Sequence, residues 1–210
     1  MAIATPLTPR KQPVQTRSAA TLEAVFEATI QVLLSHGHHK LTTTLVAERA
    51  GVSVGSLYQY YPNKHALLAA TIERHLRHIV EQVEAACQQA AGQPLEQAVR
   101  LLCDAFVDAK MARVDVSRAL YGPSAELDGP AIVKTMTFRA ASAVSALAGS
   151  LSDARFDNPP MTALFLLTAL VGPVQAVLEA GASPELVATL RQNLYALAGG
   201  YLHAVACPAL

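Results

Sequence analysis

The sequence has few aromatic residues and no segment that alternates apolar and polar side chains between hairpin turns. Aromatic residues make up 5% of its 210 residues, whereas hydrophobic residues, with many alanines and leucines, make up 52%. These shortages exclude a β-rich protein, because strands favour aromatic and β-branched residues in alternation. We expect an all-α fold with a sizeable core.

Cysteines are also scarce. Cys87, Cys103 and Cys207 are odd in number, widely spaced and flanked by apolar residues. This pattern excludes a disulfide framework and is typical of reduced packing residues in a cytoplasmic protein.

Neither a secretory signal nor a membrane span is expected. The first 17 residues have no apolar core, and polar residues, glycine and proline interrupt the apolar run from 161 to 178.

Catalytic and cofactor motifs are missing as well: there is no glycine-rich phosphate loop and no GxSxG. Asp104 and Asp108 share one helix face, but a solvated stripe explains them equally well. His75 and His78 lie three residues apart on a predicted helix, as metal ligands can, yet Cys87 is distant and no CxxC or HxxxH is present. We therefore expect that the protein is not an enzyme and that it binds no cofactor. A metal-responsive regulator using His75, His78 and Cys87 stays open as an alternative.

The formal net charge is zero, but the charge is unevenly distributed. Residues 1–64 contain six Lys or Arg against three acids, and residues 65–210 contain ten against thirteen. The first part is thus near +3 and the second near −3. A positive field over the first third of the chain favours a nucleic-acid partner there.

Residues 42–64 combine two short helical patterns with a tight turn. Hydroxyls at Thr42 to Thr44 can pair with the amides of the first helical turn, Gly51 can end that helix with a left-handed backbone, and Ser53 can cap the next one. The second pattern, residues 54–61, is too short to be stable alone and carries small or hydrogen-bonding side chains. Such a segment predicts a helix-turn-helix whose second helix fits the DNA major groove.

The same segment contains a set of residues with a known arrangement. They are Val46-Ala47, Ala50-Gly51-Val52-Ser53, Gly55-Ser56-Leu57-Tyr58, Tyr60-Tyr61 and Asn63-Lys64. Together they resemble the DNA-binding signature of TetR-type transcriptional regulators, over the region from Thr16 to Leu76. The resemblance implies a three-helix DNA-binding domain that a fourth helix joins to a helical body.

The resemblance also implies which residues contact DNA. They are Thr43, Thr44, Ser53, Val54, Gly55, Ser56, Tyr58, Gln59, Tyr60 and Lys64. Ser56 and Gln59 are expected to read base edges. Tyr58, Tyr60 and Lys64 are expected to hold phosphates. Because the third helix has no arginine, base discrimination should depend partly on DNA shape.

We expect a disordered tail over residues 1–16, a DNA-binding domain over 17–76, and an effector-binding and dimerisation domain over 77–210. Helical patterns occupy residues 16–35, 64–91, 94–120, 130–151, 160–180 and 184–206. Gly122-Pro123 is expected to end the third of these patterns.

Two groups of residues in the body are expected to bind partners. Candidates for lining an effector pocket between helices are Phe106, Met111, Tyr121, Met136, Phe138, Arg139 and Gln175, each of which also fits an ordinary core position. The last two helices must be antiparallel because their link is short, and they carry more apolar surface than one internal face uses. We predict that they form a four-helix dimer interface through Leu164, Leu167, Val171, Val174, Leu178, Leu190, Leu194 and Leu197.

The function that the resemblance implies is transcriptional regulation. We expect a ligand-responsive repressor that binds a pseudo-palindromic operator in double-stranded DNA as a homodimer and is released by a small hydrophobic or amphipathic effector. Besides the metal-responsive regulator, a helical dimerisation protein that binds no DNA stays open as an alternative.

Overall fold

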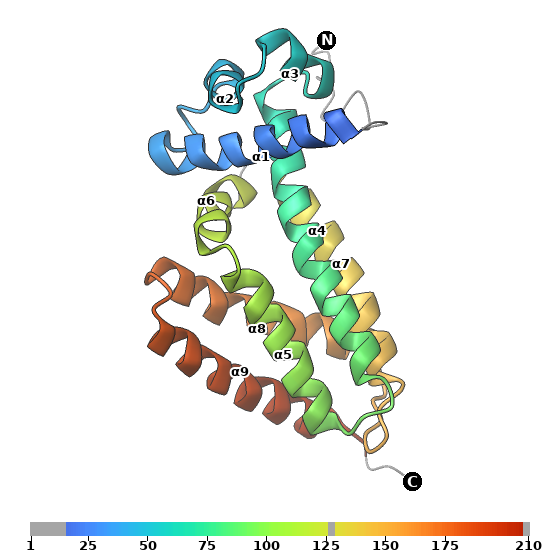
Figure 1. The fold of residues 1–210 in the computed structure, drawn as a ribbon. Helices are drawn as coiled ribbons and strands as arrows, with labels where there is room; N and C mark the ends of the chain where they lie inside the picture. Colours follow the sequence, from blue (N-terminus) through green and yellow to red (C-terminus); the bar gives the residue numbers. More distant parts are fainter. Residues whose placement is uncertain (1–15, 126–128, 208–210) are drawn as a thin grey trace, which may run out of the picture. The chain divides into compact units, whose positions relative to one another are not determined.

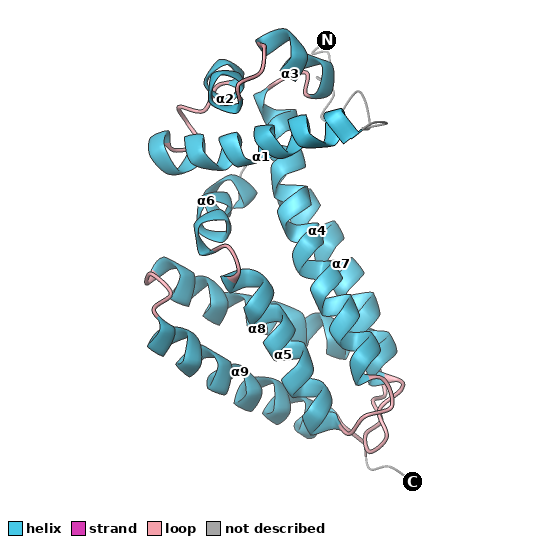
Figure 2. Cartoon of the chain, in the orientation of Figure 1, coloured by secondary structure: helices cyan, strands magenta, loops and turns pink. Residues whose placement is uncertain are grey.

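The computed structural model describes residues 16–125 and 129–207. Regular structure in them is helical, apart from one isolated antiparallel bridge between Arg155 and Cys207 (Figure 2). The helices are α1 (Thr16–His36), α2 (Thr43–Ala50), α3 (Val54–Tyr60), α4 (Lys64–Ala90), α5 (Leu95–Met111), α6 (Val114–Ala125), α7 (Gly129–Ala148), α8 (Pro159–Glu179) and α9 (Pro184–Val205) (Figure 1). The predicted all-α fold is confirmed. The predicted tail, residues 1–16, lies almost wholly outside the described residues.

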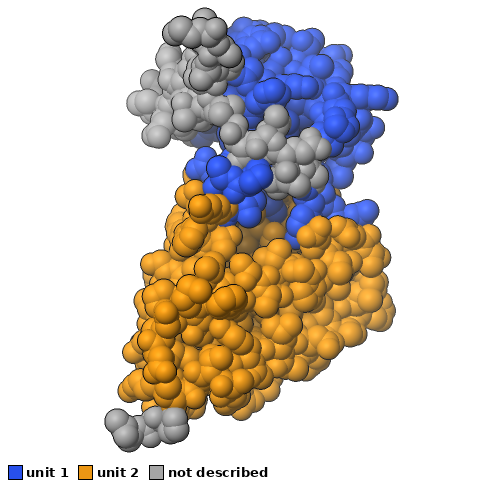
Figure 3. Space-filling model, turned by 180° about the vertical axis from the view of Figure 1, so that it is seen from behind, with its two compact units in different colours: residues 1–75, 118–133 blue, residues 76–117, 134–210 orange. Residues whose placement is uncertain are grey.

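The chain divides into two compact units (Figure 3). Unit 1 contains the described residues up to His75 together with residues 118–133, and unit 2 contains residues 76–117 and those from 134 onward. Helix α4 is continuous through the division between His75 and Leu76 and contributes residues to both units.

Unit 1 has its core where α1, α2, α3 and the first part of α4 present apolar residues at helical spacing. Val25, Ile30, Val46, Leu57 and Leu67 are each 1% exposed or less. Since α3 has only seven residues, this burial and the caps at its ends stabilise it in place of its own length.

Arg74 on α4 fixes α1 within this unit. Its guanidinium donates to the Glu23 carboxylate and lies over the Phe26 ring, 4.2 Å from the ring centroid. An ion pair and a cation–π contact thus hold the helix that braces the helix-turn-helix.

Unit 2 is a helical bundle in which α9 packs against both α5 and α8. Its core contains Leu95, Leu166, Leu170, Leu178 and Leu194, each 2% exposed or less. A polar network lies beside that core. Arg191 of α9 donates to Asp104 (2.5 Å) and Asp108 (2.6 Å) of α5, and the Tyr195 hydroxyl also donates to Asp104.

One predicted helix is two helices in the structure. The pattern over residues 94–120 divides into α5 and α6, because the chain turns at Ala112 and Arg113. The Ser117 hydroxyl donates to the Lys110 carbonyl at 2.8 Å and satisfies a group that the break would leave unpaired. The predicted end at Gly122-Pro123 is wrong, since α6 continues to Ala125. Proline removes one amide, and here that loss affects only the last turn of the helix.

The link between α8 and α9 has the expected antiparallel geometry (Figure 1). Gly181 and Ala182 have positive φ angles of 99° and 52°, and the Ser183 hydroxyl accepts from the Leu186 amide at 3.3 Å. Among the described helices, α8 is long and apolar enough to cross a membrane by composition alone. Its side chains Leu166 and Leu170 are in the core of unit 2, but only 39% of its apolar window is buried, so core packing explains that composition in part.

Candidate nucleic-acid interface

The turn between α2 and α3 is built by local hydrogen bonds that its residues favour. The Thr42 hydroxyl accepts from the Leu45 amide at 3.2 Å and caps α2. Gly51 then adopts φ 67°, where its missing Cβ avoids a steric cost. The Ser53 hydroxyl accepts from the Ser56 amide at 3.0 Å and caps α3. These caps fix the angle at which α3 leaves α2.

Helix α3 is buried on one side and polar on the other. Leu57 is 1% exposed and anchors the helix, whereas Gly55, Tyr58 and Gln59 are exposed. Val54, Ser56 and Tyr60 are half-buried at the margins of that face, and Ser53 is exposed beside it. The outer face is therefore small at its start and hydrogen-bonding farther along, as a helix that enters the major groove requires.

Thr43 and Thr44 lie in different environments. Thr43 is only 7% exposed, and its hydroxyl lies 3.0 Å from that of Tyr58, which is itself 42% exposed. Thr44 is exposed. Thr43 thus positions the Tyr58 hydroxyl, and Thr44 is the threonine whose side chain has open surface.

The start of α4 provides positive electrostatic potential beside this face. The Asn63 side chain accepts from the Ala66 amide at 2.8 Å and caps the helix, and Lys64 is its first residue. The helix dipole and the lysine both favour an anion at this end. Tyr61 is half-buried before the cap, and burial raises the pKa of its hydroxyl. That environment suits a packing role for the Tyr61 ring.

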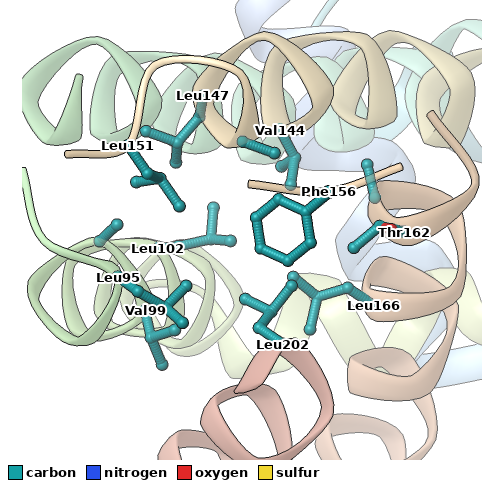
Figure 4. A pocket seen from close by; sticks show the side chains of 13 residues that line it. Leu95, Val99, Leu102, Val144, Leu147, Leu151, Phe156, Thr162, Leu166 and Leu202 are labelled. Carbon is teal, nitrogen blue, oxygen red and sulfur yellow. The ribbon is translucent and has the colours of Figure 1, made fainter. Parts of the chain in front are cut away.

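Unit 2 contains a small apolar cavity of about 20 Å³ (Figure 4). Its wall includes Leu102, Val144, Leu151, Phe156, Leu166 and Leu202, from α5, α7, the α7–α8 segment, α8 and α9. None of the seven effector candidates lines it. Sequence reasoning missed the wall because its residues have ordinary helical core periodicity, and Phe156 lies in a polar segment without periodicity.

The effector candidates are dispersed. Phe106 is buried away from this cavity, and Met111, Tyr121, Met136 and Gln175 are half-buried. Phe138 and Arg139 are exposed on α7. Arg139 borders an open groove of about 670 Å³ with Glu84 and Cys87. Its guanidinium donates to both carboxylate oxygens of Glu84 at 2.7 and 2.6 Å.

The residues predicted for a dimer interface differ in how far they are exposed in one chain. Leu167, Val174, Leu178, Leu190 and Leu194 are buried within one chain, Leu164 is half-buried, and Val171 and Leu197 are exposed. Other large apolar side chains of α8 and α9 are exposed too, including Met161, Phe165, Leu186 and Val205. The exposed apolar side chains of these two helices, here called the exposed apolar face, are only partly those predicted.

The alternative metal site does not assemble. His75 is buried, His78 is exposed and Cys87 is buried. Across residues 16–125 and 129–207, no group of three His, Cys, Asp or Glu side chains is placed to hold a metal ion. Burial and the neighbouring Glu84 raise the pKa of Cys87 to about 11, which keeps the thiol protonated and a poor ligand near neutral pH.

Two family models match the chain. The model described as bacterial regulatory proteins, tetR family, matches residues 25–71, and that described as tetracyclin repressor-like, C-terminal domain, matches residues 94–202. The first covers the last part of α1, all of α2 and α3, and the start of α4, and the second spans over half of the chain.

Known regulators are similar to about a third of the chain. The chain is 27% identical over 60 residues to the fatty acid metabolism regulator protein of Bacillus subtilis, covering 29% of this chain and 31% of that protein. It is 33% identical over 73 residues to the HTH-type transcriptional repressor KstR of Mycolicibacterium smegmatis, covering 35% of each. The match thus spans about a third of each relative's length.

Solved structures share the whole fold. A TetR-family transcriptional regulator from Mesorhizobium loti superposes with a TM-score of 0.73 at 16% identity, covering 92% of this chain and all of that one. The fatty acid degradation regulator FadR from Bacillus halodurans superposes with a TM-score of 0.70 at 17% identity, covering 91% and 96%. At these identities the likeness concerns the fold alone.

Proposed function

Because this chain belongs to the TetR family of bacterial regulatory proteins, as its two matched regions show, we propose that it is a ligand-responsive repressor. Family membership makes the chain a soluble DNA-binding transcriptional regulator and not an enzyme. It also implies an operator in double-stranded DNA and a homodimer. The proposal adds the cytoplasmic location, the sign of control, the contact residues and the effector class.

The observation that carries the DNA-binding role is the exposed polar face of a fully capped α3. Gly55 permits close approach to the groove, and Ser56 and Gln59 can hydrogen-bond base edges. Ser53 and Val54 begin the same face. Tyr58, Tyr60, Thr44 and Lys64 surround it with hydroxyls and a positive charge suited to phosphates.

Exposed apolar side chains on α8 and α9 support assembly through these two helices. Phe165 is 58% exposed, Val171 40% and Leu197 38%. Two copies that bury this face against each other would present two α3 helices to DNA, so the operator should be a pseudo-palindrome.

The apolar cavity of unit 2 supports a hydrophobic or amphipathic effector. Its wall carries no charged side chain, so it suits an apolar chain or ring. At about 20 Å³ it is far smaller than ligand pockets, which are commonly about 300–1,000 Å³, so the effector must enlarge it. Enlargement that changes unit 2 would shift the population of DNA-binding states. Relatives named for fatty acid metabolism agree with that class.

Repression is proposed as the sign of control, although relatives differ in their names. KstR is a transcriptional repressor and FasR of Mycolicibacterium smegmatis a transcriptional activator. The test is a two-step selection. Genomic fragments bound by the purified protein are sequenced, and compounds are then screened for release of the best fragment and for derepression of its promoter. Failure to enrich any fragment at low salt would refute the DNA-binding role.

Lys64→Ala tests the phosphate contact within this proposal. The variant should bind all sequences more weakly, and the magnitude of the slope of log K against log salt should fall by about two units, about one for each subunit of the dimer. Fluorescence anisotropy across a salt series measures both effects. An unchanged slope would show that Lys64 does not contact phosphate.

A further inference from the structure

The apolar cavity is lined in part by Phe156, which lies in a loop and not in a helix. Of the 13 residues that line it, 12 are buried and Phe156 alone is half-exposed. Figure 4 shows the Phe156 ring pointing into the cavity, between Val144 and Leu202. Since the other wall residues are buried, Phe156 is the lining side chain that is also partly open to solvent.

The segment that carries Phe156 is firmly held on its upstream side. Leu151 and Ala154 are 4% and 3% exposed. The Ser152 amide donates to the Gln93 carbonyl at 3.2 Å, and the Asp153 carboxylate accepts from the Leu95 amide at 2.7 Å. These contacts attach residues 151–154 to the start of α5, so this part forms a fixed base for the residues that follow.

The next three residues are attached to the chain's C-terminal segment. The Cys207 amide donates to the Arg155 carbonyl at 2.8 Å, and the Cys207 thiol donates to an Asp157 carboxylate oxygen at 3.2 Å. The hydrogen bond from the thiol to Asp157 also raises the pKa of Cys207, which keeps the donor protonated. Two hydrogen bonds from one residue thus bracket Phe156.

We propose that Phe156 is a gate to the cavity, that Cys207 is its latch, and that an apolar chain or ring of the effector replaces the Phe156 ring when the gate opens. The inference rests on the proposed function in placing the effector here, and it adds the route of entry and the residue displaced. An uncharged segment is required because the wall offers no partner for a charge. Opening breaks two hydrogen bonds at the edge of unit 2 and leaves the base, residues 151–154, in place.

A lone tryptophan can report the gate directly, because the sequence contains none. In Phe156→Trp the indole should occupy the cavity, and titration with 1-octanol should shift its emission to the red as it moves into water. Leu34→Trp, at a 53% exposed position on α1 in unit 1, is the control and should not shift. If 1-octanol binds to Phe156→Trp while the indole emission stays blue, the ring is not displaced and the gate is refuted.

Calorimetry with 1-octanol in the absence of DNA provides the second test. Phe156→Ala removes the group that the ligand must displace, so it should bind at least about tenfold more tightly than wild type. Leu34→Ala, at an exposed position of unit 1, should match wild type. Cys207→Ala loses one hydrogen bond of the latch and should bind about two- to tenfold faster in stopped-flow mixing. Should Phe156→Ala fail to fold, the Cys207→Ala rate and the tryptophan shift decide the question.

These outcomes separate the gate from the proposed repression. Tighter binding by Phe156→Ala together with no release of operator would support the gate and refute its role in regulation. Equal 1-octanol affinity of wild type and Phe156→Ala, with unchanged association by Cys207→Ala, would refute the gate even if another compound released the operator.

Discussion

Gly55 is the residue at which free-protein stability and DNA binding should respond in opposite directions. A Cβ added there would meet only the Ser53 hydroxyl, at 3.8 Å, so the fold has room for alanine. Within a helix, Gly→Ala stabilises by about 0.5–1 kcal/mol. The same methyl group would project from the face proposed to enter the major groove.

We therefore expect Gly55→Ala to raise the unfolding midpoint and to weaken operator binding by about tenfold, which corresponds to about 1.4 kcal/mol. Urea unfolding and anisotropy titration measure the two effects on one preparation. Weaker DNA binding with lower stability would point to a damaged fold instead. Undiminished binding would mean that Gly55 does not approach the bases.

Lys110 makes stability depend on pH. The residue is 8% exposed, and burial lowers the pKa of its ammonium from 10.5 to about 8. Between these values the unfolded chain binds a proton that the folded chain does not, so the free energy of unfolding rises with pH. Below about 8 both states are protonated and the contribution of this group is constant.

Comparison with Lys110→Met isolates this effect from other titrating groups. The stability of wild type minus that of Lys110→Met should increase by about 1–3 kcal/mol between pH 7 and 10. Urea unfolding of both proteins across this range measures the difference. A difference that stays flat would show that Lys110 titrates normally in the folded protein.

At the scale of elements, the turn between α8 and α9 contains a strained residue. Ala182 has φ 52°, a left-handed conformation that costs an L-residue about 1–2 kcal/mol. Ala182→Gly should remove that cost and, after the larger entropy of unfolded glycine, stabilise by about 0.5–1 kcal/mol. Thermal unfolding measures the gain. Ala180→Gly, at φ −74°, has no such strain to relieve and should not stabilise. Equal effects of the two variants would contradict the explanation.

Elements whose signals are local could be predicted from the sequence. Thr42, Gly51 and Ser53 each act within a few residues of themselves, so the caps and the turn of the helix-turn-helix were predictable. The break between α5 and α6 was not, because Ala112 and Arg113 are good helix residues. There the side chain of Ser117, folded back onto Lys110, determines the outcome.

Residues of the site were also predictable only where their role depends on neighbours in the sequence and not on tertiary packing. A motif assigns Thr43 and Thr44 alike, but only tertiary packing buries Thr43 against Tyr58. Nothing local distinguishes Phe156 from other loop residues. Its place in the cavity depends on α5, α7, α8 and α9 together, and on Cys207, which is 51 positions farther along the chain.

For the whole molecule, the two units separate two tasks. Unit 1 contains the capped α3, and unit 2 contains both the cavity and the exposed apolar face of α8 and α9. Helix α4 belongs to both units, so a change in unit 2 has a covalent, helical route to the residues proposed to contact DNA. A dimer would double the DNA surface that one short recognition helix contacts, which strengthens specific binding.

The dimer can be tested by placing a charge on the exposed apolar face. In Phe165→Glu the new carboxylate would be buried against the partner twice, once per subunit, and an unpaired buried charge is costly. We expect the dimer to dissociate at least about tenfold more readily, with operator affinity falling in parallel.

Phe138→Glu is the matched control, because Phe138 is 54% exposed but lies on α7. Sedimentation velocity measures assembly and anisotropy measures DNA binding. If Phe165→Glu stays dimeric while Phe138→Glu dissociates, the subunits associate through α7 and not through α8 and α9.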